Sequence, residues 1–427
     1  MPELTICVIG LGYIGLPTAA LLASGGYRVF GCDRSEHVVD TVNRGDVHIV
    51  EPDLDAYVRS AVKSGRLSAS TDPRPADVYI VCVPTPFREG DREDGATGDH
   101  TPDLSYVLAA TDAIAPLVKP GDMVILESTS PVGTTDAMVA VLAKAGIDVA
   151  ALAIAYCPER VLPGRIMVEL TENARIVGGQ TPAAARRVAD FYRSFVRGEV
   201  LETDARTGEM CKLVENSFRD VNIAFANELS LLCSRFGIDP WALIALANRH
   251  PRVNILQPGV GVGGHCIAVD PWFLVSAQPD IARLIRTARQ VNLAKTDWVI
   301  EEIVAEAQKR PGPVACLGAS FKPDIDDLRE SPALDVVRAL AQRGIEVLVV
   351  EPHVSAIDGL DLTSLDEALG RCGVIALLVP VLKVSWMFDP QINIIAFGIS
   401  ALIGVVFGYF PARRAAALNP IDALRHE

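Results

Sequence analysis

Basic residues are scarce relative to acidic ones in this chain: 39 Lys and Arg stand against 53 Asp and Glu, which gives a net charge of −14 at pH 7. Proteins that bind nucleic acids use clustered Lys and Arg to neutralise phosphates. We therefore expect no nucleic-acid partner. Small anionic nucleotides stay candidate ligands, because a glycine loop or a helix N-terminus binds phosphate even in an acidic protein.

Cysteine pairs of the CxxC type and metal-ligand spacings are also missing, although the sequence holds nine cysteines. The cysteines are scattered through apolar runs such as TICVIG and YIVCVP. This pattern is typical of buried free thiols in a reducing compartment. We therefore expect free cysteines and no bound metal.

The N-terminal sequence MPELTICVIG lacks the basic segment, the apolar segment and the cleavage site of a secretory signal peptide. Together with the free thiols, this predicts a cytoplasmic location. Half of the 427 residues are hydrophobic, which predicts two or three domains with packed cores.

The first motif that carries chemistry is GLGYIG at 10–15, which lies between a strand-like run and a helix-like stretch. Gly10 allows a tight turn, Gly12 lets a pyrophosphate approach the backbone, and Gly15 lets helix and strand pack closely. A second strand-like run ends at Asp33, which can accept hydrogen bonds from both ribose hydroxyls and would repel a 2′-phosphate. The motif predicts a dinucleotide site that favours NAD over NADP; the alternative is a βα unit without a ligand.

Strand-like and Ala-rich helix-like runs alternate over roughly the first 190 residues, which predicts an α/β fold with a doubly wound parallel sheet. Ligands of such sheets lie beyond the carboxyl ends of the strands. Three loops with polar groups are expected there: PTP at 84–86, STSPVGT at 128–134 and CPER at 157–160.

Two long helices are predicted over 203–248 and 281–308. Lys212 and Asn216 are four residues apart on the first, so they share a face. A lysine on a helix is usually solvated, but its apolar neighbours suggest that this helix is largely buried.

A second βα pattern begins at 314–317 and continues with strands at 347–350 and 373–379. It resembles another nucleotide-binding half. Lys322 and Arg329, in the loop after its first strand, are available for phosphate or nucleotide contacts; a solvated charged loop is the alternative.

Residues 259–273 read GVGVGGHCIAVDPWF and place Cys266 after four glycines, next to His265 and four residues before Asp270. A nucleophilic cysteine needs close substrate approach, a charge partner and a fixed backbone. The alternative is a glycine-rich turn that holds a core cysteine.

In the light of these motifs, the chain from about residue 4 to 378 resembles the UDP-glucose/GDP-mannose dehydrogenase family of nucleotide-sugar 6-dehydrogenases. The motifs that carry the resemblance are GLGYIGLP at 10–17, ILESTSPVGTT at 125–135, YCPER at 156–160, KLVEN at 212–216, VGGHCIAVDPWF at 262–273 and FKPDIDDLRESPA at 321–333. The GGHCIAVDPWF form points to the branch that acts on UDP-N-acetylmannosamine. Relatives usually carry proline where this chain has Val260.

The resemblance implies a homodimer of three-domain chains. We expect an NAD-binding Rossmann domain over 1–195, a central helical dimerisation domain over 196–308, and a truncated, Rossmann-like UDP-binding domain over 309–379. The cofactor-binding residues expected from the motif and the strand ends are Gly10, Gly12, Tyr13, Ile14, Gly15, Asp33, Arg34, Pro84, Thr85 and Thr129.

The activity that the resemblance implies is a four-electron oxidation of a UDP-sugar C6 alcohol to the carboxylate with two NAD, through a thioester on Cys266. Lys212 would stabilise an oxyanion or transfer a proton, Asn216 and Asp270 would position water, Glu159 would assist hydrolysis and Thr129 would hold a water. The expected substrate-binding residues are Glu159, Arg160, Lys212, Asn216, Arg252, Gly263, His265, Lys322 and Arg329. Arg249 or Arg252 would reach the neighbouring subunit's site.

The tail over 380–427 departs from the family and resembles the C-terminus of a macrolide-export-type ABC transporter permease. Its residues 392–410 carry no charge and are long enough for a transmembrane-like helix, so we consider membrane association. A single span would place the following arginines outside, against the positive-inside rule, which favours an inert fusion. For the tail, the alternative is a core helix that completes the third domain. For the activity of the chain, the alternatives are an inactive fusion protein and a dehydrogenase for UDP-N-acetylglucosamine or UDP-glucose.

Overall fold

The computed structural model describes residues 4–88, 100–264, 266–322 and 327–379. The predicted tail with its apolar helix at 392–410, and His265, lie outside the described residues. Within the described ranges, no helix has both the length and the apolar character to cross a membrane.

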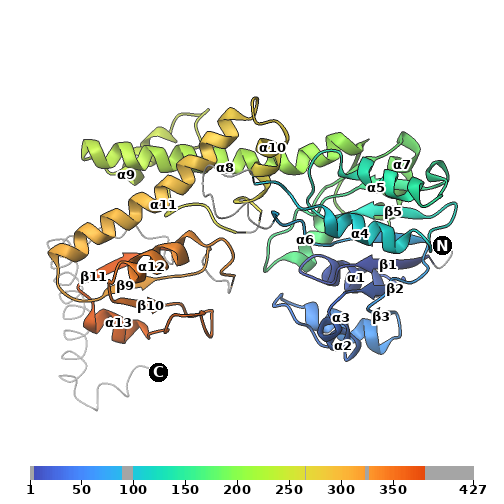
Figure 1. Ribbon diagram of the computed structural model, residues 1–427, viewed down its shortest axis with the longest axis horizontal. Coiled ribbons are helices and arrows are strands. Elements are labelled where there is room, and N and C mark those ends of the chain that lie inside the picture. Colours follow the sequence, from blue (N-terminus) through green and yellow to red (C-terminus); the bar gives the residue numbers. More distant parts are fainter. Residues whose placement is uncertain (1–3, 89–99, 265, 323–326, 380–427) are drawn as a thin grey trace, which may run out of the picture. The chain divides into compact units, whose positions relative to one another are not determined.

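An eight-stranded sheet forms the N-terminal part, in the order β3-β2-β1-β4-β5-β6-β7-β8 (Figure 1). The strands are β1 (Thr5–Ile9), β2 (Arg28–Cys32), β3 (Leu67–Ser70), β4 (Val78–Val81), β5 (Met123–Leu126), β6 (Ala153–Tyr156), β7 (Arg175–Gly179) and β8 (Val200–Asp204). Its helices are α1 (Gly15–Ser24), α2 (Glu36–Asn43), α3 (Leu54–Lys63), α4 (Ser105–Ile114), α5 (Thr134–Lys144), α6 (Ile166–Glu172) and α7 (Pro182–Arg193), with a short 3-10 turn η2 (Val149–Ala151). The predicted doubly wound α/β fold is confirmed.

Side chains that alternate along β1 enter two separate cores, because successive residues of a strand point to opposite faces. Ile6 and Val8 join a core with α1, α3 and α7, whereas Cys7 and Ile9 join a core with α4 and α5. Both faces of the sheet are thus covered by helices, which explains why these strands read as continuous apolar runs.

The alternation of strands and helices predicted a fully parallel sheet, and this prediction is wrong at one strand. β7 runs antiparallel to β6, with Tyr156 opposite Gly178, whereas the other neighbouring strands of this sheet are parallel. The connection between β6 and β7 contains the seven-residue α6. The chain enters β7 at the end of the sheet where it left β6, so β7 runs in the direction opposite to β6.

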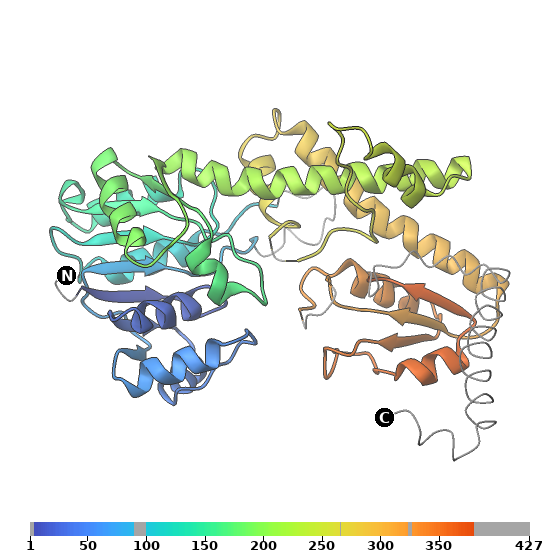
Figure 2. The ribbon, with the colours of Figure 1, turned by 180° about the vertical axis from the view of Figure 1, so that it is seen from behind.

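The long helix predicted over 203–248 is two helices, α8 (Ala205–Phe236) and α9 (Pro240–Ala247). Gly237 ends α8 at φ +66°, a conformation that favours glycine, and Asp239 caps the Trp241 N–H of α9. The segment continues with α10 (Asp270–Ala277) and α11 (Arg283–Lys309), and α11 packs along α8 (Figure 2).

A three-stranded parallel sheet, in the order β10-β9-β11, follows α11. Its elements are β9 (Val314–Leu317), α12 (Pro332–Gln342), β10 (Val347–Val350), α13 (Leu365–Arg371) and β11 (Val374–Leu377). The three predicted strands are confirmed, and among the described residues β11 forms one edge of the sheet.

Candidate active site

The glycine turn after β1 has the geometry that its sequence predicts. Gly10 has φ +91°, and a Cβ built there would lie 2.6 Å from the Cys82 carbonyl oxygen. A Cβ on Gly15 would lie 1.8 Å from the Gly10 oxygen, so α1 packs closely on the turn. A Cβ on Gly12 would meet nothing within 4 Å, and Ile14 precedes α1 without a side-chain cap. The backbone is therefore open to an anion at Gly12 and the first turn of α1.

Asp33 stands beside this turn, because β1 and β2 are neighbours in the sheet. Its carboxylate accepts hydrogen bonds from the Leu11 and Ser35 N–H groups, each at 2.9 Å. Arg34, next in the chain, is exposed. The sequence identified Asp33 but not its contact with the glycine turn.

The loops after β4 and β5 are joined by side-chain hydrogen bonds. The Thr85 hydroxyl donates to the Thr129 carbonyl at 2.6 Å, and the Ser128 hydroxyl donates to the Val83 carbonyl at 2.7 Å. Pro84 between them is exposed, whereas Thr85 is buried. The predicted polar loops thus meet at the carboxyl edge of the sheet.

Cys266 is exposed, whereas Cys7, Cys32 and Cys157 are among the cysteines buried in the cores. It lies one turn before α10, and its carbonyl accepts the Asp270 N–H at 2.8 Å. The surrounding protein raises the pKa of its thiol by desolvation and Asp270 raises it further, whereas Lys212 acts in the opposite direction. All nine cysteines are free, as predicted.

Three predicted catalytic residues meet at this cysteine. Asn216 donates from Nδ2 to Oδ2 of Asp270 at 2.5 Å, which joins α8 to α10. Asp270 is 3% exposed, and burial raises its pKa to about 6 against the opposing effect of Lys212 and Asn216. Lys212 is itself buried on α8, one turn before Asn216. The alternative of a solvated lysine at this position is thus excluded.

The glycine loop before Cys266 is packed against the third domain. A Cβ on Gly263 would lie 2.4 Å from the Glu330 carbonyl oxygen, and one on Gly264, at φ +87°, 2.7 Å from the Phe321 ring. The Thr296 hydroxyl of α11 donates to the Val260 carbonyl at 2.9 Å. The backbone that presents the thiol is therefore fixed by residues far away in the sequence.

Glu159 is held in a buried ion pair that the sequence did not predict. Its Oε2 lies 2.5 Å from Nη1 of Arg175, and its Oε1 accepts the Arg160 N–H at 2.7 Å. The Arg160 guanidinium forms an ion pair with Glu215 at 2.6 Å, one residue before Asn216. Arg175 belongs to none of the sequence motifs. Its pairing with Glu159 depends on the antiparallel register of β7, which the sequence did not predict.

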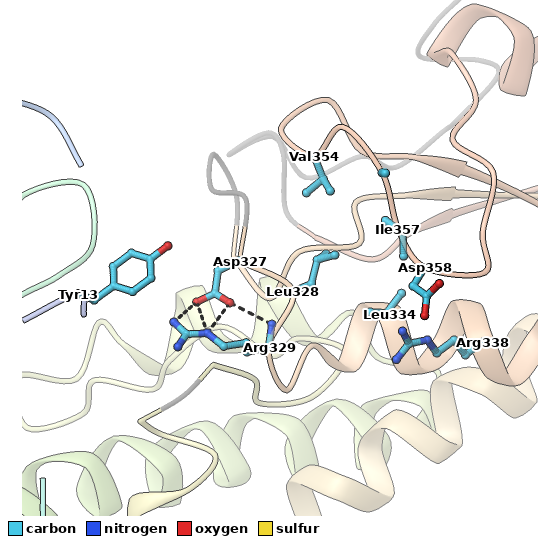
Figure 3. A pocket seen from close by; sticks show the side chains of 10 residues that line it. Tyr13, Asp327, Leu328, Arg329, Leu334, Arg338, Val354, Ile357 and Asp358 are labelled. Carbon is cyan, nitrogen blue, oxygen red and sulfur yellow. Dashed lines mark hydrogen bonds and ion pairs between the residues drawn. The ribbon is translucent and has the colours of Figure 1, made fainter. Parts of the chain in front are cut away.

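A cavity of about 540 Å³ joins the glycine turn to the third domain. Figure 3 shows the Arg329 guanidinium beside Asp327 and facing the Tyr13 ring, and the guanidinium carbon lies 5.3 Å from the ring centroid. Arg338 and Asp358 line the same cavity further into the third domain. A predicted cofactor residue and a predicted substrate residue thus share one cavity.

Two predicted substrate residues have no described contact with this cluster. Arg252 is exposed, and its N–H donates to Nδ1 of His250. Lys322 is exposed in the loop after β9. Their roles stay predictions.

Three family models match the chain in succession. They describe the NAD-binding domain (residues 4–196), the central domain (206–294) and the UDP-binding domain (315–390) of the UDP-glucose/GDP-mannose dehydrogenase family. The third match extends past residue 379, where we expected the family pattern to end.

Curated relatives match most of the chain. It is 54% identical to the UDP-N-acetyl-D-mannosamine dehydrogenase of Escherichia coli, with 88% of this chain and 93% of that protein covered. It is 53% identical to an NDP-N-acetyl-D-galactosaminuronic acid dehydrogenase of Ralstonia solanacearum, with coverages of 88% and 90%.

A solved structure of the UDP-N-acetyl-mannosamine dehydrogenase from S. aureus is 41% identical, covers 88% of each chain and superposes with a TM-score of 0.80. The resemblance of the tail to a permease receives no support from these comparisons. The order of the domains, the two glycine-rich loops and these matches establish that the chain belongs to the UDP-glucose/GDP-mannose dehydrogenase family, an NAD-dependent enzyme family.

Proposed function

We propose that this protein oxidises the C6 alcohol of UDP-N-acetyl-D-mannosamine to the uronate with NAD, through a thioester on Cys266. The observation that carries the proposal is an exposed cysteine next to a cluster of Lys212, Asn216 and Asp270. The two similar proteins named for UDP-N-acetylmannosamine support the choice of sugar.

The residues of the glycine turn fit NAD. Gly12 and the first N–H groups of α1 are open to a pyrophosphate, and Asp33 keeps lone pairs for a ribose although Leu11 and Ser35 already donate to it. Thr85 and Thr129 would line the nicotinamide end. NAD, when bound, supplies the acceptor for the hydride that leaves the sugar carbon.

The chain's own residues supply the covalent chemistry. After the first oxidation, the Cys266 sulfur forms a bond with the aldehyde carbon, and Lys212 stabilises the negative charge on the carbonyl oxygen. Asp270, ionised above about pH 6, accepts the thiol proton. The second oxidation converts the thiohemiacetal into a thioester, and water then replaces the sulfur. The alcohol and one water yield the carboxylate and three protons, while two NAD are reduced.

The UDP-sugar is expected between the glycine turn and the third domain. Arg329 and Lys322 are proposed to bind the diphosphate, because guanidinium and ammonium groups bind phosphate oxygens, although Arg329 is also paired with Asp327. Arg160 is paired with Glu215, and its contact with the substrate stays a prediction. Gly263 is packed against Glu330, and its contact with the sugar stays a prediction. His265 stays a predicted contact.

Self-association is the proposed quaternary state, and a stripe on α8 supports it. Six large apolar side chains are at least 41% exposed and fall within about 80° of arc at 100° per residue: Met210, Val214, Phe218, Phe225, Leu232 and Phe236. A stripe of this length is unusual on the surface of a monomer. A second copy of the chain would bury it, so we propose a homodimer. Membrane association through 392–410 stays a prediction from the sequence.

The direct test counts NADH per sugar with the full chain, NAD and UDP-N-acetylmannosamine. We expect two NADH per sugar, and Cys266→Ser abolishes acid formation while it leaves NAD binding unchanged. A half-buried thiol away from the cluster is changed in the matched control, Cys372→Ser, which keeps full activity. Full activity of Cys266→Ser would contradict the proposal.

A second candidate substrate is an NDP-linked N-acetylgalactosamine, which the Ralstonia relative favours. The same assay with a panel of UDP-sugars separates the two. A higher kcat/KM for the galacto sugar would replace the manno assignment and leave the thioester chemistry intact.

A further inference from the structure

Glu159 receives its orientation from one strand reversal in the sheet. Because β7 is antiparallel to β6, Ala155 lies opposite Gly179 and Tyr156 opposite Gly178. Continuing this register for three residues places Glu159 opposite Arg175, the first residue of β7. A parallel β7 would have placed Arg175 at the other end of the sheet.

Arg175 is the positive centre of a buried network. Its side chain is 2% exposed, lies 2.5 Å from Oε2 of Glu159 and 4.0 Å from Oε1 of Glu127, and stacks 5.3 Å from the Tyr192 ring centroid. Tyr192 donates to Glu127 at 2.6 Å. One guanidinium therefore serves two carboxylates, and burial raises the pKa of Glu127.

Burial removes these charged groups from water, so the network by itself is weak evidence for stability. The hydrogen bonds of Glu127 connect the network to the cofactor side of the sheet: Thr18 of α1 donates at 3.5 Å and Cys82, beside Gly10, donates at 3.3 Å. On the other side, Arg160 ties the Glu159 loop to Glu215 of α8, next to Asn216. The network thus lies between the glycine turn and the catalytic helix.

We propose that Arg175 is a positioning residue that fixes Glu159 for hydrolysis of the thioester. In this step the water oxygen bonds to the acyl carbon, the water proton passes to Glu159, and the C–S bond breaks to release the Cys266 thiolate. Each Glu159 oxygen keeps a lone pair beyond its contacts with Arg175 and the Arg160 N–H. Arg175 acts through Glu159 and does not touch the reacting atoms. The inference rests on the proposed function.

The test follows the acyl enzyme rather than activity alone. Enzyme, NAD and UDP-N-acetylmannosamine are mixed rapidly, quenched and analysed by intact mass and NADH absorbance. In Arg175→Met we expect a burst of two NADH per site, an adduct on Cys266, and a kcat lowered about a hundredfold, the order of loss that a misplaced group produces. Arg175→Lys restores part of the rate.

Arg193→Met is the matched control, because Arg193 also pairs with two carboxylates but on the surface of α7. We expect the Arg193→Met variant to form no adduct on Cys266 and to keep the kcat of the wild-type enzyme. A loss of rate in Arg175→Met without an adduct, or with loss of the first NADH, would overturn the inference while the proposed function stands. Absence of NADH with wild-type protein would refute the proposed function, and the inference with it.

Arg175→Met leaves buried carboxylates unpaired, which endangers folding. The double variant Arg175→Met/Glu159→Gln removes the charge of Glu159 as well, so it supplies a second measurement. If Arg175 acts through Glu159, the double variant has the same kcat as Glu159→Gln. A further tenfold loss would show an independent role and overturn the inference.

Discussion

At the scale of single residues, the candidate site combines an exposed thiol with a buried acid. The pKa values of Cys266 and Asp270 are both raised, chiefly because the surrounding protein disfavours the charged form of each group. A raised thiol pKa means that the free protein holds a weak nucleophile at neutral pH. Asp270, with a pKa near 6, is ionised there and can take the thiol proton.

Asp270→Asn should separate function from stability. The folded pKa of about 6 lies above the ordinary value of 3.8, so folding favours the protonated acid, and the ionised form destabilises the protein above about pH 6. The variant should lose activity yet gain on the order of 1–3 kcal/mol in the free energy of unfolding at pH 8. The gain should fall as the pH drops from about 6 towards 3.8. Urea unfolding at pH 8 and pH 4 measures both values.

Asp77→Asn is the control with the opposite sign. Two hydrogen bonds from Thr5, at 2.8 and 2.7 Å, lower the pKa of Asp77, so its ionised form stabilises the fold. This variant should lose stability at pH 8. A loss of stability in Asp270→Asn of similar size would contradict the assigned burial cost.

At the scale of elements, apolar runs in the sequence predicted where strands lie along the chain better than they predicted the direction in which neighbouring strands pair. The strands at 28–32 and 314–317 are found where the sequence placed them. The reversal of β7 was missed, because an apolar run does not encode the direction of its pairing. The break after Phe236 was missed as well, although Gly237 and Pro240 are strong helix terminators and gave the signal.

The interface between α8 and α11 is polar in a way that the sequence did not reveal. Arg289 of α11 lies 2.7 Å from Asp220 of α8, and both are buried. Lys295, further along α11, is 5% exposed, and its ammonium group donates to the Ser230 hydroxyl at 2.9 Å. The same ammonium nitrogen lies over the Trp298 ring. Desolvation lowers its pKa to about 8.

Lys295→Met should therefore stabilise the protein at neutral pH. A lowered lysine pKa means that the charged form is penalised in the fold, fully below about pH 8, and the penalty disappears as the pH rises towards 10.5. We expect a gain on the order of 1–3 kcal/mol at pH 7 that shrinks by pH 10. Lys309→Met, on the exposed end of the same helix, should change stability by less than about 0.5 kcal/mol. A destabilised Lys295→Met at pH 7 would contradict the penalty.

At the scale of the whole molecule, the sequence identified the motifs but not the contacts that connect them. The glycine turn and Cys266 follow from local sequence, since a backbone that must approach a ligand requires glycine. The packing of Gly263 on Glu330, and the pairing of Glu159 with Arg175, join residues that are distant in sequence. Such contacts depend on strand order and domain packing, which residue spacing does not specify.

The proposed homodimer gives the α8 stripe a measurable consequence. Phe218 and Phe225 are 69% and 54% exposed near the middle of the stripe. Phe218→Glu/Phe225→Glu would place like charges at the centre of a two-fold contact, where desolvated charges cost several kcal/mol. We expect the wild-type chain to sediment as a dimer and the double variant as a monomer with an unchanged far-UV spectrum.

The control for this experiment changes exposed apolar residues elsewhere. Leu365 and Leu369 of α13 are 47% and 45% exposed and lie in the third domain, outside the stripe. Leu365→Glu/Leu369→Glu should leave the dimer intact. Because the resemblance predicts that Arg249 or Arg252 reaches the neighbouring subunit, the monomeric variant should also lose UDP-sugar turnover while it still binds NAD. A fully active monomer would show that each site is complete within one chain and would refute the cross-subunit role of these arginines.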